Sequence, residues 1–316
     1  MTSPALPSIW FERPVLPELV EVVEASCSVL GPGTDVDRYA GIETAVGAIA
    51  GAAPYDGSVM DRAPSLRVIA RTGIGYDAVD IGAATARGIA VCNTPDGPTI
   101  STAEHAITLM LMVAKKAKAA EASLTTGTSA GYYARHEGIE LDGKVLGLVG
   151  CGRIARRVGA MAEAIGMRIT TFDPYCDPTA IPSGFASVPT LDALLHDADV
   201  VSVHVPLTDA SHGMFDAGRF AAMKRGAIFV NTARGGLVDQ DALLAALDAS
   251  QLVGAGLDVT TPEPLPEDDP LLEAPNLLVL PHIGSATTRT RARMADMAVD
   301  NLLAALAGKA MPHPAG

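Results

Sequence analysis

Short apolar runs alternate with helical stretches along almost the whole chain, and this alternation is typical of stacked β-α units around parallel sheets. In the first third, the apolar runs predict strands at Ile9–Phe11, Ser28–Leu30, Val46–Ala50, Arg67–Arg71 and Ile89–Cys92. The helical stretches between them begin near Pro17, Val36, Gly57 and Asp80. The pattern therefore predicts one α/β lobe in this part of the chain.

A second set of strands follows a long helix, which the pattern places from about Ser101 to Ala120. Residues 122–142 have no clean period and are interpreted as a connecting or dimer-contacting arm. A closing helix is expected from about Thr287 to Ala307. The second set of strands is expected at Val145–Val149, Arg168–Phe172, Val200–Val203, Ala227–Val230, Gly254–Asp258 and Leu277–Leu280.

The composition narrows the class of protein. With 316 residues the chain suits two domains, and its net charge of −13 disfavours a nucleic-acid surface or a polybasic membrane patch. The four cysteines are scattered, which predicts a reducing compartment and gives no zinc-ligand spacing. The chain shows no signal-peptide pattern, and its longest apolar stretch, Ala106–Ala114, is too short for a bilayer. We therefore expect a soluble cytoplasmic protein without a metal site, and we expect Lys115, Lys116 and Lys118 to form a solvated helix face.

The first candidate site is a glycine loop directly after the predicted strand Val145–Val149. Its sequence, Gly150-Cys151-Gly152-Arg153-Ile154-Ala155, matches G-x-G-x-x-A, in which the first glycine permits a tight turn and the second lets the backbone approach a pyrophosphate. A helix starting near Arg153 would direct its N-terminal amides at the phosphates. Asp173 ends the next strand, where a carboxylate binds the adenosine ribose hydroxyls and repels a 2′-phosphate, so NAD is predicted rather than NADP. The alternative is a strand-to-helix turn that binds nothing.

Three further residues, each just past a predicted strand, have the chemistry that reduction of a 2-keto acid requires. Arg234 can bind a carboxylate through its planar fork, and His282 can deliver a proton near neutral pH. Glu263 can stabilise the imidazolium and orient its ring. Because ligands bind at the carboxyl ends of strands in open α/β sheets, these positions predict one catalytic site. The alternatives are a surface arginine, a solvated glutamate and a helix-capping histidine.

Several longer motifs in the same order resemble the D-isomer-specific 2-hydroxyacid dehydrogenase family, and the resemblance covers nearly the whole chain. They are RTGIGYD at 71–77, HVPLT at 204–208, NTARGGLVD at 231–239, LDV at 257–259 with PEP at 262–264, and PHIGS at 281–285, whereas Thr260 and Thr261 depart from the family pattern. The resemblance implies an NAD-dependent oxidoreductase in which Arg234 anchors the substrate, His282 is the acid/base and Glu263 pairs with His282.

The resemblance also implies the architecture and the binding residues. Two doubly wound parallel-sheet lobes are expected: a Rossmann NAD-binding domain at residues 97–285 and a discontinuous flavodoxin-like substrate domain at residues 1–96 plus 286–316. Ile74 and Gly75 are expected to hold the substrate carboxylate, because the glycines of this loop free backbone amides for an anion. A homodimer is expected. The residues expected to bind the cofactor are Thr102, Gly150, Gly152, Arg153, Ile154, Asp173, His204, Pro206, Thr232, Ala233, Asp258 and Gly284.

The substrate is expected to be a small 2-keto or 2-hydroxy acid without a phosphate. Phosphate recognition needs an extra Arg or Lys near the first-lobe loops; Ile49–Ala53 carries none, and Arg71 is the only nearby candidate. Hydroxypyruvate and glyoxylate are therefore favoured, with D-3-phosphoglycerate as the alternative within the family. Formate or phosphite dehydrogenase is a further alternative in the same superfamily. The alternative of another class is an NADH-sensing binding module of the co-repressor type.

Overall fold

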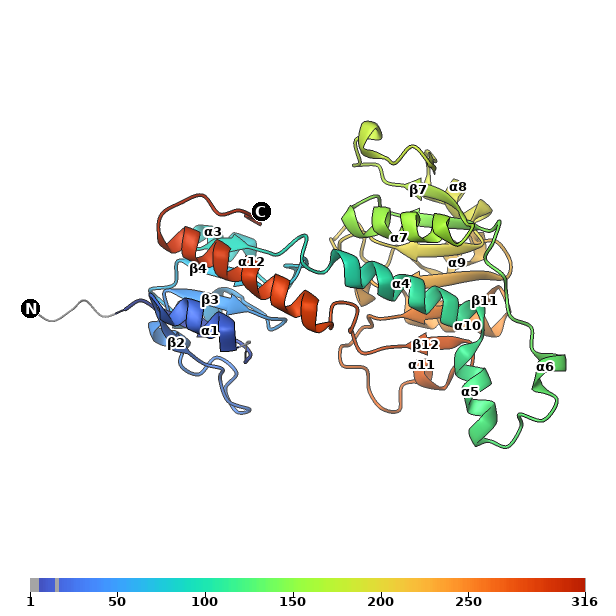
Figure 1. Cartoon of the computed structure of the whole chain (residues 1–316), viewed down its shortest axis with the longest axis horizontal. Coiled ribbons are helices and arrows are strands. Elements are labelled where there is room, and N and C mark those ends of the chain that lie inside the picture. Colours follow the sequence, from blue (N-terminus) through green and yellow to red (C-terminus); the bar gives the residue numbers. More distant parts are fainter. Residues whose placement is uncertain (1–5, 15–16, 316) are drawn as a thin grey trace, which may run out of the picture. The chain divides into compact units, whose positions relative to one another are not determined.

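The computed structural model describes residues 6–14 and 17–315. The chain divides into two compact units, residues 1–98 with 286–316 and residues 99–285, which we call unit 1 and unit 2. Unit 1 is discontinuous in sequence, because the segment that follows unit 2 returns to it as a long helix, drawn in red in Figure 1.

Within the described residues, unit 1 contains a parallel sheet of five strands in the order β2-β1-β3-β4-β5, which is the flavodoxin-like order of doubly wound sheets. The strands are β1 (Ser8–Phe11), β2 (Ser28–Leu30), β3 (Gly47–Ala50), β4 (Val68–Arg71) and β5 (Ala90–Cys92). In register, Trp10 of β1 lies beside Leu30 of β2 and Ala48 of β3. The helices are α1 (Pro17–Glu24), α2 (Gly57–Arg62), α3 (Ile81–Ala86) and α12 (Thr288–Leu306), with a 3₁₀ turn at Ile42–Thr44.

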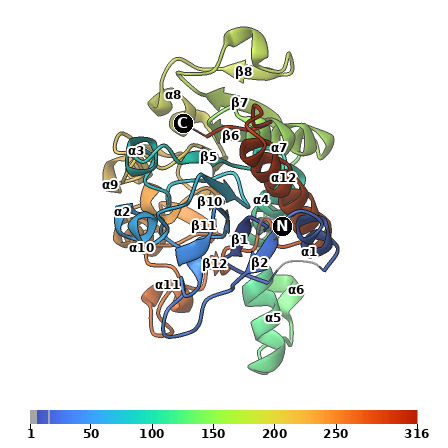
Figure 2. The ribbon, with the colours of Figure 1, turned by 90° about the vertical axis from the view of Figure 1, so that its left-hand side faces the viewer.

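Successive strand residues point to opposite faces of this sheet, so one apolar run contributes to two cores. Ile9 and Phe11 pack with residues of α12 such as Leu302, whereas Trp10 packs with Tyr55 on the other face. Figure 2 shows α1 and α12 on one side of the strands and α2 and α3 on the other. Because helices cover both faces, the strands are nearly continuous apolar runs rather than alternating ones.

Unit 2, every residue of which the structure describes, contains a parallel sheet of seven strands in the order β12-β11-β10-β9-β6-β7-β8. The chain winds outward from β6 through β7 to β8, then returns to β9 on the other side of β6 and continues outward. The carboxyl ends of β6 and β9 therefore flank a topological switch point, where open α/β sheets bind ligands. The strands are β6 (Val145–Val149), β7 (Arg168–Phe172), β8 (Phe185–Ser187), β9 (Val200–Val203), β10 (Ala227–Asn231), β11 (Leu252–Leu257) and β12 (Leu277–Val279).

Helices cover both faces of the second sheet. Ile228 and Val230 of β10 pack in the cluster beneath α4 and α7, and Phe229 between them packs against Phe220 of α9. The prediction of two α/β lobes with parallel sheets is confirmed. The helices are α4 (Thr99–Ala114), α5 (Ala117–Thr125), α6 (Tyr132–Arg135), α7 (Arg153–Ala164), α8 (Leu191–Asp197), α9 (Ala217–Ala222), α10 (Gln240–Asp248) and α11 (Pro270–Glu273), with 3₁₀ turns at Pro178–Ala180 and Gly235–Leu237.

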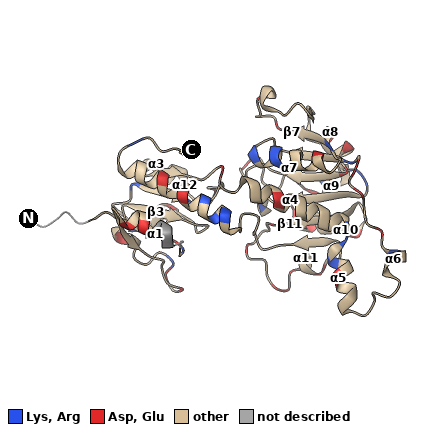
Figure 3. Cartoon of the chain, in the orientation of Figure 1, with Lys and Arg blue, Asp and Glu red and all other residues tan. Residues whose placement is uncertain are grey.

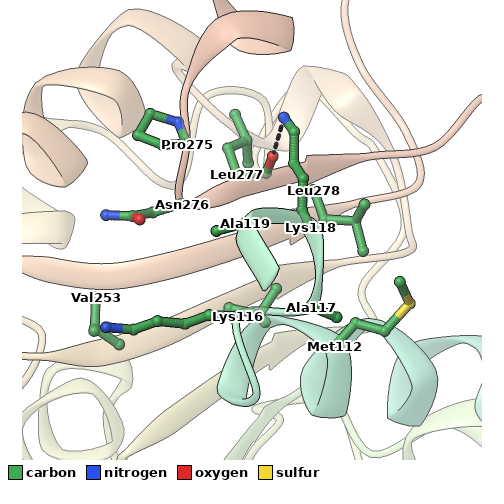
Figure 4. Close-up of a pocket in the computed structure, with 11 residues that line it drawn as sticks. Met112, Lys116, Ala117, Lys118, Ala119, Val253, Pro275, Asn276, Leu277 and Leu278 are labelled. Atoms are coloured by element: carbon green, nitrogen blue, oxygen red, sulfur yellow. Dashed lines mark hydrogen bonds between the residues drawn. The ribbon is translucent and has the colours of Figure 1, made fainter. Parts of the chain in front are cut away.

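The stretch expected to be one helix from Ser101 to Ala120 is two helices. Lys116 adopts a left-handed conformation (φ 50°, ψ 41°) between α4 and α5 and redirects the chain. Of the three lysines expected to form a solvated face, Lys115 is exposed and donates to the Ile139 carbonyl, whereas Lys118 departs from the expectation because burial lowers its pKa. Beside a small pocket (Figure 4), the Lys118 ammonium donates to the carbonyls of Leu272, Ala274 and Leu277. These tertiary hydrogen bonds hold the bend where the sequence has neither glycine nor proline.

Candidate active site

The glycine loop follows β6 and leads into α7. Gly150 has φ +99°, and a Cβ atom there would lie 2.7 Å from the carbonyl oxygen of His204, so a side chain is excluded. Gly152 is the N-cap of α7 and, as a glycine, has no side chain that could accept a hydrogen bond from the first helix amides. No heavy atom of the described residues lies within 4 Å of a Cβ built at Gly152. Open space therefore lies beside the uncapped amides of a 12-residue helix, which is the geometry that binds phosphate.

The first turns of α7 are also basic. Arg153, Arg156 and Arg157 lie there, and Figure 3 shows the basic end of this helix in blue. The Arg156 Nε donates to the carbonyl of Cys151 in the glycine loop at 2.7 Å. An anion at this helix start would therefore meet positive charge as well as amides.

Asp173 follows β7 and folds back onto the glycine loop. Its Oδ2 accepts a hydrogen bond from the Cys151 amide at 2.8 Å, and its Oδ1 accepts one from the Tyr175 amide at 3.0 Å. The carboxylate predicted from the sequence to bind a ribose is therefore held directly beside the glycine turn.

His204 and Pro206 follow β9, on the other side of the switch point. The His204 amide donates to Val149 O at 2.8 Å, and its Nε2 lies 2.9 Å from Ser202 Oγ. Burial lowers the pKa of His204 to about 4, so the ring is neutral at physiological pH. The Pro206 carbonyl accepts a hydrogen bond from Ser211 Oγ at 2.7 Å. These residues form the wall beside Gly150 rather than a proton donor.

The loop after β10 carries Thr232, Ala233 and Arg234. Asn231 clamps it, because its Oδ1 accepts from the Ala233 amide at 2.9 Å and its Nδ2 donates to the Arg234 carbonyl at 2.8 Å. The Thr232 hydroxyl is buried and has no hydrogen-bond partner among the described residues. A buried hydroxyl without a partner is costly, and a bound polar ligand would satisfy it.

His282 and Glu263 meet at the ends of β12 and β11. The distance from His282 Nδ1 to Glu263 Oε2 is 3.0 Å, and Glu263 Oε1 accepts from the Thr260 amide at 3.2 Å. Burial raises the pKa of Glu263, but the hydrogen bond and charge of His282, the Thr260 amide and the charge of Arg234 together outweigh it and lower the pKa. Glu263 is therefore a carboxylate at neutral pH, engages Nδ1 and leaves Nε2 for proton exchange. Because the charge of Arg234 also acts on Glu263, the three predicted catalytic side chains lie within electrostatic range of one another in unit 2.

Asp258 lies beneath this site and is 1% exposed. Its Oδ1 and Oδ2 accept hydrogen bonds from the amides of Ile283 and Gly284, both at 2.8 Å, and its carbonyl accepts from the His282 amide at 2.7 Å. His282 itself has φ +53°, a conformation that costs energy for a residue with a side chain. Asp258 therefore holds the strained turn that presents the imidazole.

His105 is a residue that the sequence analysis does not place in the site. Its Nε2 lies 3.0 Å from Asp258 Oδ1, and the side chain is 13% exposed. Thr102, one helical turn earlier on α4, is buried, and a Cβ at Gly284 would lie 2.9 Å from Asp258 Oδ2 and 3.6 Å from Thr102 Cγ2. The available signal was the spacing of His105 from Thr102, since residues three apart share one helix face.

Ile74 and Gly75 belong to unit 1, in the loop after β4. Gly73 has φ +155°, its carbonyl accepts from the Thr94 amide at 3.0 Å, and the Ile74 carbonyl accepts from Asn93 Nδ2 at 2.7 Å. The loop carbonyls are thus directed to the residues after β5. This arrangement leaves the amide side of the loop as its candidate ligand-binding side.

The residues of unit 2 fit a dinucleotide. The uncapped start of α7, the open space at Gly152, the carboxylate of Asp173 and the buried Thr232 hydroxyl are the features that a phosphate, a ribose and a polar ring substituent require. Over residues 6–14 and 17–315, no helix is both long and apolar enough to cross a bilayer.

Comparisons with known proteins agree with this geometry. Residues 107–284 match the family described as "D-isomer specific 2-hydroxyacid dehydrogenase, NAD binding domain". A glyoxylate reductase of Korarchaeum cryptofilum is 41% identical over 82% of this chain and 79% of its own length. A D-3-phosphoglycerate dehydrogenase of Archaeoglobus fulgidus is 42% identical over 73% of this chain, but the match spans only 44% of that protein. The solved structure of an NADPH-dependent glyoxylate/hydroxypyruvate reductase of Sinorhizobium meliloti, in complex with NADP and malonate, is 31% identical, covers 99% of this chain and 97% of its own, and has a TM-score of 0.86.

Proposed function

Because this chain belongs to the D-isomer specific 2-hydroxyacid dehydrogenase family, we propose that it reduces an unphosphorylated 2-keto acid, of the hydroxypyruvate or glyoxylate type, with NADH. The catalytic residues are Arg234, Glu263 and His282. The observation that carries this proposal is the 3.0 Å contact of His282 Nδ1 with Glu263 Oε2, within the electrostatic reach of Arg234. The glyoxylate reductase of Korarchaeum cryptofilum, which the match covers over most of its length, supports the choice of substrate.

The residues divide the chemistry between them. NADH, when bound, supplies the hydride that reaches the carbonyl carbon. Arg234 binds the substrate carboxylate through its guanidinium and stabilises the negative charge that develops on the carbonyl oxygen. His282, as an imidazolium, donates the Nε2 proton to that oxygen, so that keto acid, NADH and one proton give hydroxy acid and NAD⁺. Glu263 stabilises the imidazolium before the transfer and orients the ring through Nδ1.

The remaining predicted residues have binding roles in this proposal. The glycine loop (Gly150, Gly152, Arg153 and Ile154) binds the pyrophosphate, and Asp173 binds the adenosine ribose. The carboxylate of Asp173 favours NAD over NADP, in contrast to the NADPH-dependent reductase of Sinorhizobium meliloti. Ile74 and Gly75 bind substrate through backbone amides. Thr102, His204, Pro206, Thr232, Ala233, Asp258 and Gly284 line the cofactor side.

The two units take separate roles, and the chain forms a homodimer in the cytoplasm. Residues 97–285 form the NAD-binding domain, and residues 1–96 plus 286–316 form the substrate domain. The arm formed by α5 and α6 stands out from the rest of unit 2 (Figures 1 and 2), and its Leu124 and Tyr133 side chains are 70% and 97% exposed. Large apolar side chains exposed on a projecting arm suit a contact with a second copy.

The experiment is a panel of 2-keto acids with NADH oxidation as the readout. Glyoxylate and hydroxypyruvate are expected to be reduced, each with a higher kcat/KM than 3-phosphohydroxypyruvate. Preference for the phosphorylated acid would instead support the function named for the relative of Archaeoglobus fulgidus. Tight NADH binding without turnover of any acid would support the binding-module alternative.

A further inference from the structure

Glu12 lies at the carboxyl end of β1, and its side chain is 8% exposed. Its Oε2 accepts a hydrogen bond from the Gly51 amide at 2.5 Å, and its Oε1 accepts one from the Ala53 amide at 3.0 Å. A Cβ atom at Gly51 would collide with the Glu12 carboxylate, so the glycine is what permits this contact. The amides of Gly51 and Ala53, in the loop after β3, thus form an anion-binding site that the carboxylate of Glu12 occupies.

This receptor lies on the edge of unit 1 that carries the candidate substrate loop. The strands β1, β3 and β4 are adjacent and parallel, so their carboxyl ends share one edge of the sheet. The Glu12 amide donates to Ile49 O at 3.1 Å, and the amide and hydroxyl of Thr72 both donate to Ala50 O at 2.9 Å. Only β3 therefore separates β1, which Glu12 follows, from β4, which the loop with Ile74 and Gly75 follows.

At this edge of the sheet, Glu12 contributes a negative charge. The Arg13 Nε lies 3.8 Å from Glu12 Oε1, and the Arg13 side chain is 69% exposed. A solvent-exposed arginine at that distance compensates a buried carboxylate only weakly. Burial raises the pKa of Tyr55, the charge of Glu12 raises it further and the charge of Arg71 lowers it, so the carboxylate of Glu12 and the guanidinium of Arg71 both act on this edge.

We propose that Glu12 is a specificity-determining residue, which occupies the amides available to a second anionic group and repels substrates that carry one, such as a phosphate ester at C3. The inference rests on the proposed function and deepens it, because it assigns rejection of the phosphorylated acid to one side chain. A substrate with a single carboxylate and a neutral or small C3 group meets no such repulsion. The loop after β3 lacks basic residues, which explains why it would attract a phosphate only weakly. The lack of basic residues does not explain why a phosphate would be excluded.

The test compares kcat/KM for hydroxypyruvate with that for 3-phosphohydroxypyruvate in the wild type and in Glu12→Gln. The glutamine keeps one acceptor for the loop amides and removes the charge. The preference for hydroxypyruvate is expected to fall at least about tenfold, chiefly through a lower KM for the phosphate ester. Glu12→Asp, which keeps the charge, is expected to retain the preference. Glu43→Gln is the matched control, since Glu43 is an exposed acid of the same unit that pairs with Arg62.

A measurement on the wild type keeps the proposal testable if Glu12→Gln does not fold. The ratio of the two kcat/KM values is expected to shift toward the phosphate ester as ionic strength rises, because salt screens the repulsion. An unchanged ratio in Glu12→Gln, or with salt in the wild type, would overturn the role of Glu12 and leave the reductase function standing. Failure of the wild type to reduce any 2-keto acid would overturn the proposed function itself.

Discussion

The imidazole of His282 and the carboxylate of Glu263 lie 3.0 Å apart between Nδ1 and Oε2, with 42% and 39% of their side chains exposed. Contacts at this level of exposure add little to folding stability, because water screens the charges. In the proposed function the value of the pair is chemical, because one ring nitrogen is engaged by Glu263 and the other is left for proton transfer.

His282→Ala is expected to lower kcat for keto-acid reduction by about 10²–10⁴-fold, because the proton donor is lost. NADH affinity, measured by fluorescence titration, is expected to stay near that of the wild type. His196→Ala is the control, since His196 is an exposed surface residue paired with Asp197. Similar kcat values for His282→Ala and the wild type would remove this side chain from the mechanism.

Glu263→Gln is expected to change the pH dependence of reduction. Glutamine does not titrate, so the variant should lack the part of the pH profile that follows the ionisation of Glu263. In the wild type the lowered pKa of Glu263 means that its contact with His282 is present at neutral pH and is lost only as pH falls through that lowered pKa, below the ordinary value of 4.5. A pH–kcat profile that is superimposable for both proteins would contradict the pairing.

Asp258→Asn is expected to loosen the turn that holds His282. An amide side chain has a single acceptor oxygen, so the Ile283 or Gly284 amide loses its partner, at a cost of about 1–3 kcal/mol in the free energy of unfolding. The fall in kcat should exceed the change in KM for the keto acid, because His282 is displaced from its strained conformation. Urea denaturation and steady-state kinetics measure the two effects, and Asp192→Asn, at an exposed ion pair with Arg219, is the control.

The two loop glycines are expected to respond differently to alanine. Gly150→Ala places a side chain at φ +99° and against the His204 carbonyl, which should destabilise the protein by about 1–3 kcal/mol. Gly152 has φ −72°, and open space lies where a Cβ atom would be added. Gly152→Ala should therefore leave the melting temperature unchanged and lower the affinity for NADH. If Gly152→Ala binds NADH as tightly as the wild type does, the pyrophosphate does not lie against this residue.

Asp173→Asn is expected to reduce the preference for NAD over NADP by about tenfold or more, because a negative charge beside the 2′-position is removed. The measurement is the ratio of kcat/KM values for NADH and NADPH. Asp177→Asn is the control, since Asp177 lies in the same connection and caps a 3₁₀ turn. A ratio that does not move would show that the carboxylate of Asp173 faces away from the ribose.

Much of the fold and site could be predicted because the signals are local. The strand, turn and helix around Gly150 and Gly152 are contiguous in sequence, and each candidate catalytic residue lies in the loop that follows a strand. Strands buried on both faces are short apolar runs, so their positions can be read from the chain without knowing their neighbours. The break at Lys116 could not be read in this way, because hydrogen bonds from Lys115 and Lys118 to distant segments override the helical pattern.

The sequence by itself determined the class of the protein: parallel α/β lobes, a dinucleotide loop, and an arginine, a glutamate and a histidine at strand ends. Only the tertiary structure decided which side chains meet, such as His105 with Asp258 and Glu12 with the amides of Gly51 and Ala53. The physical reason is the distance along the sequence over which each kind of interaction acts. Periodicity and turn chemistry act over a few neighbouring residues, whereas these contacts join segments that become close only when the order of strands in each sheet is established.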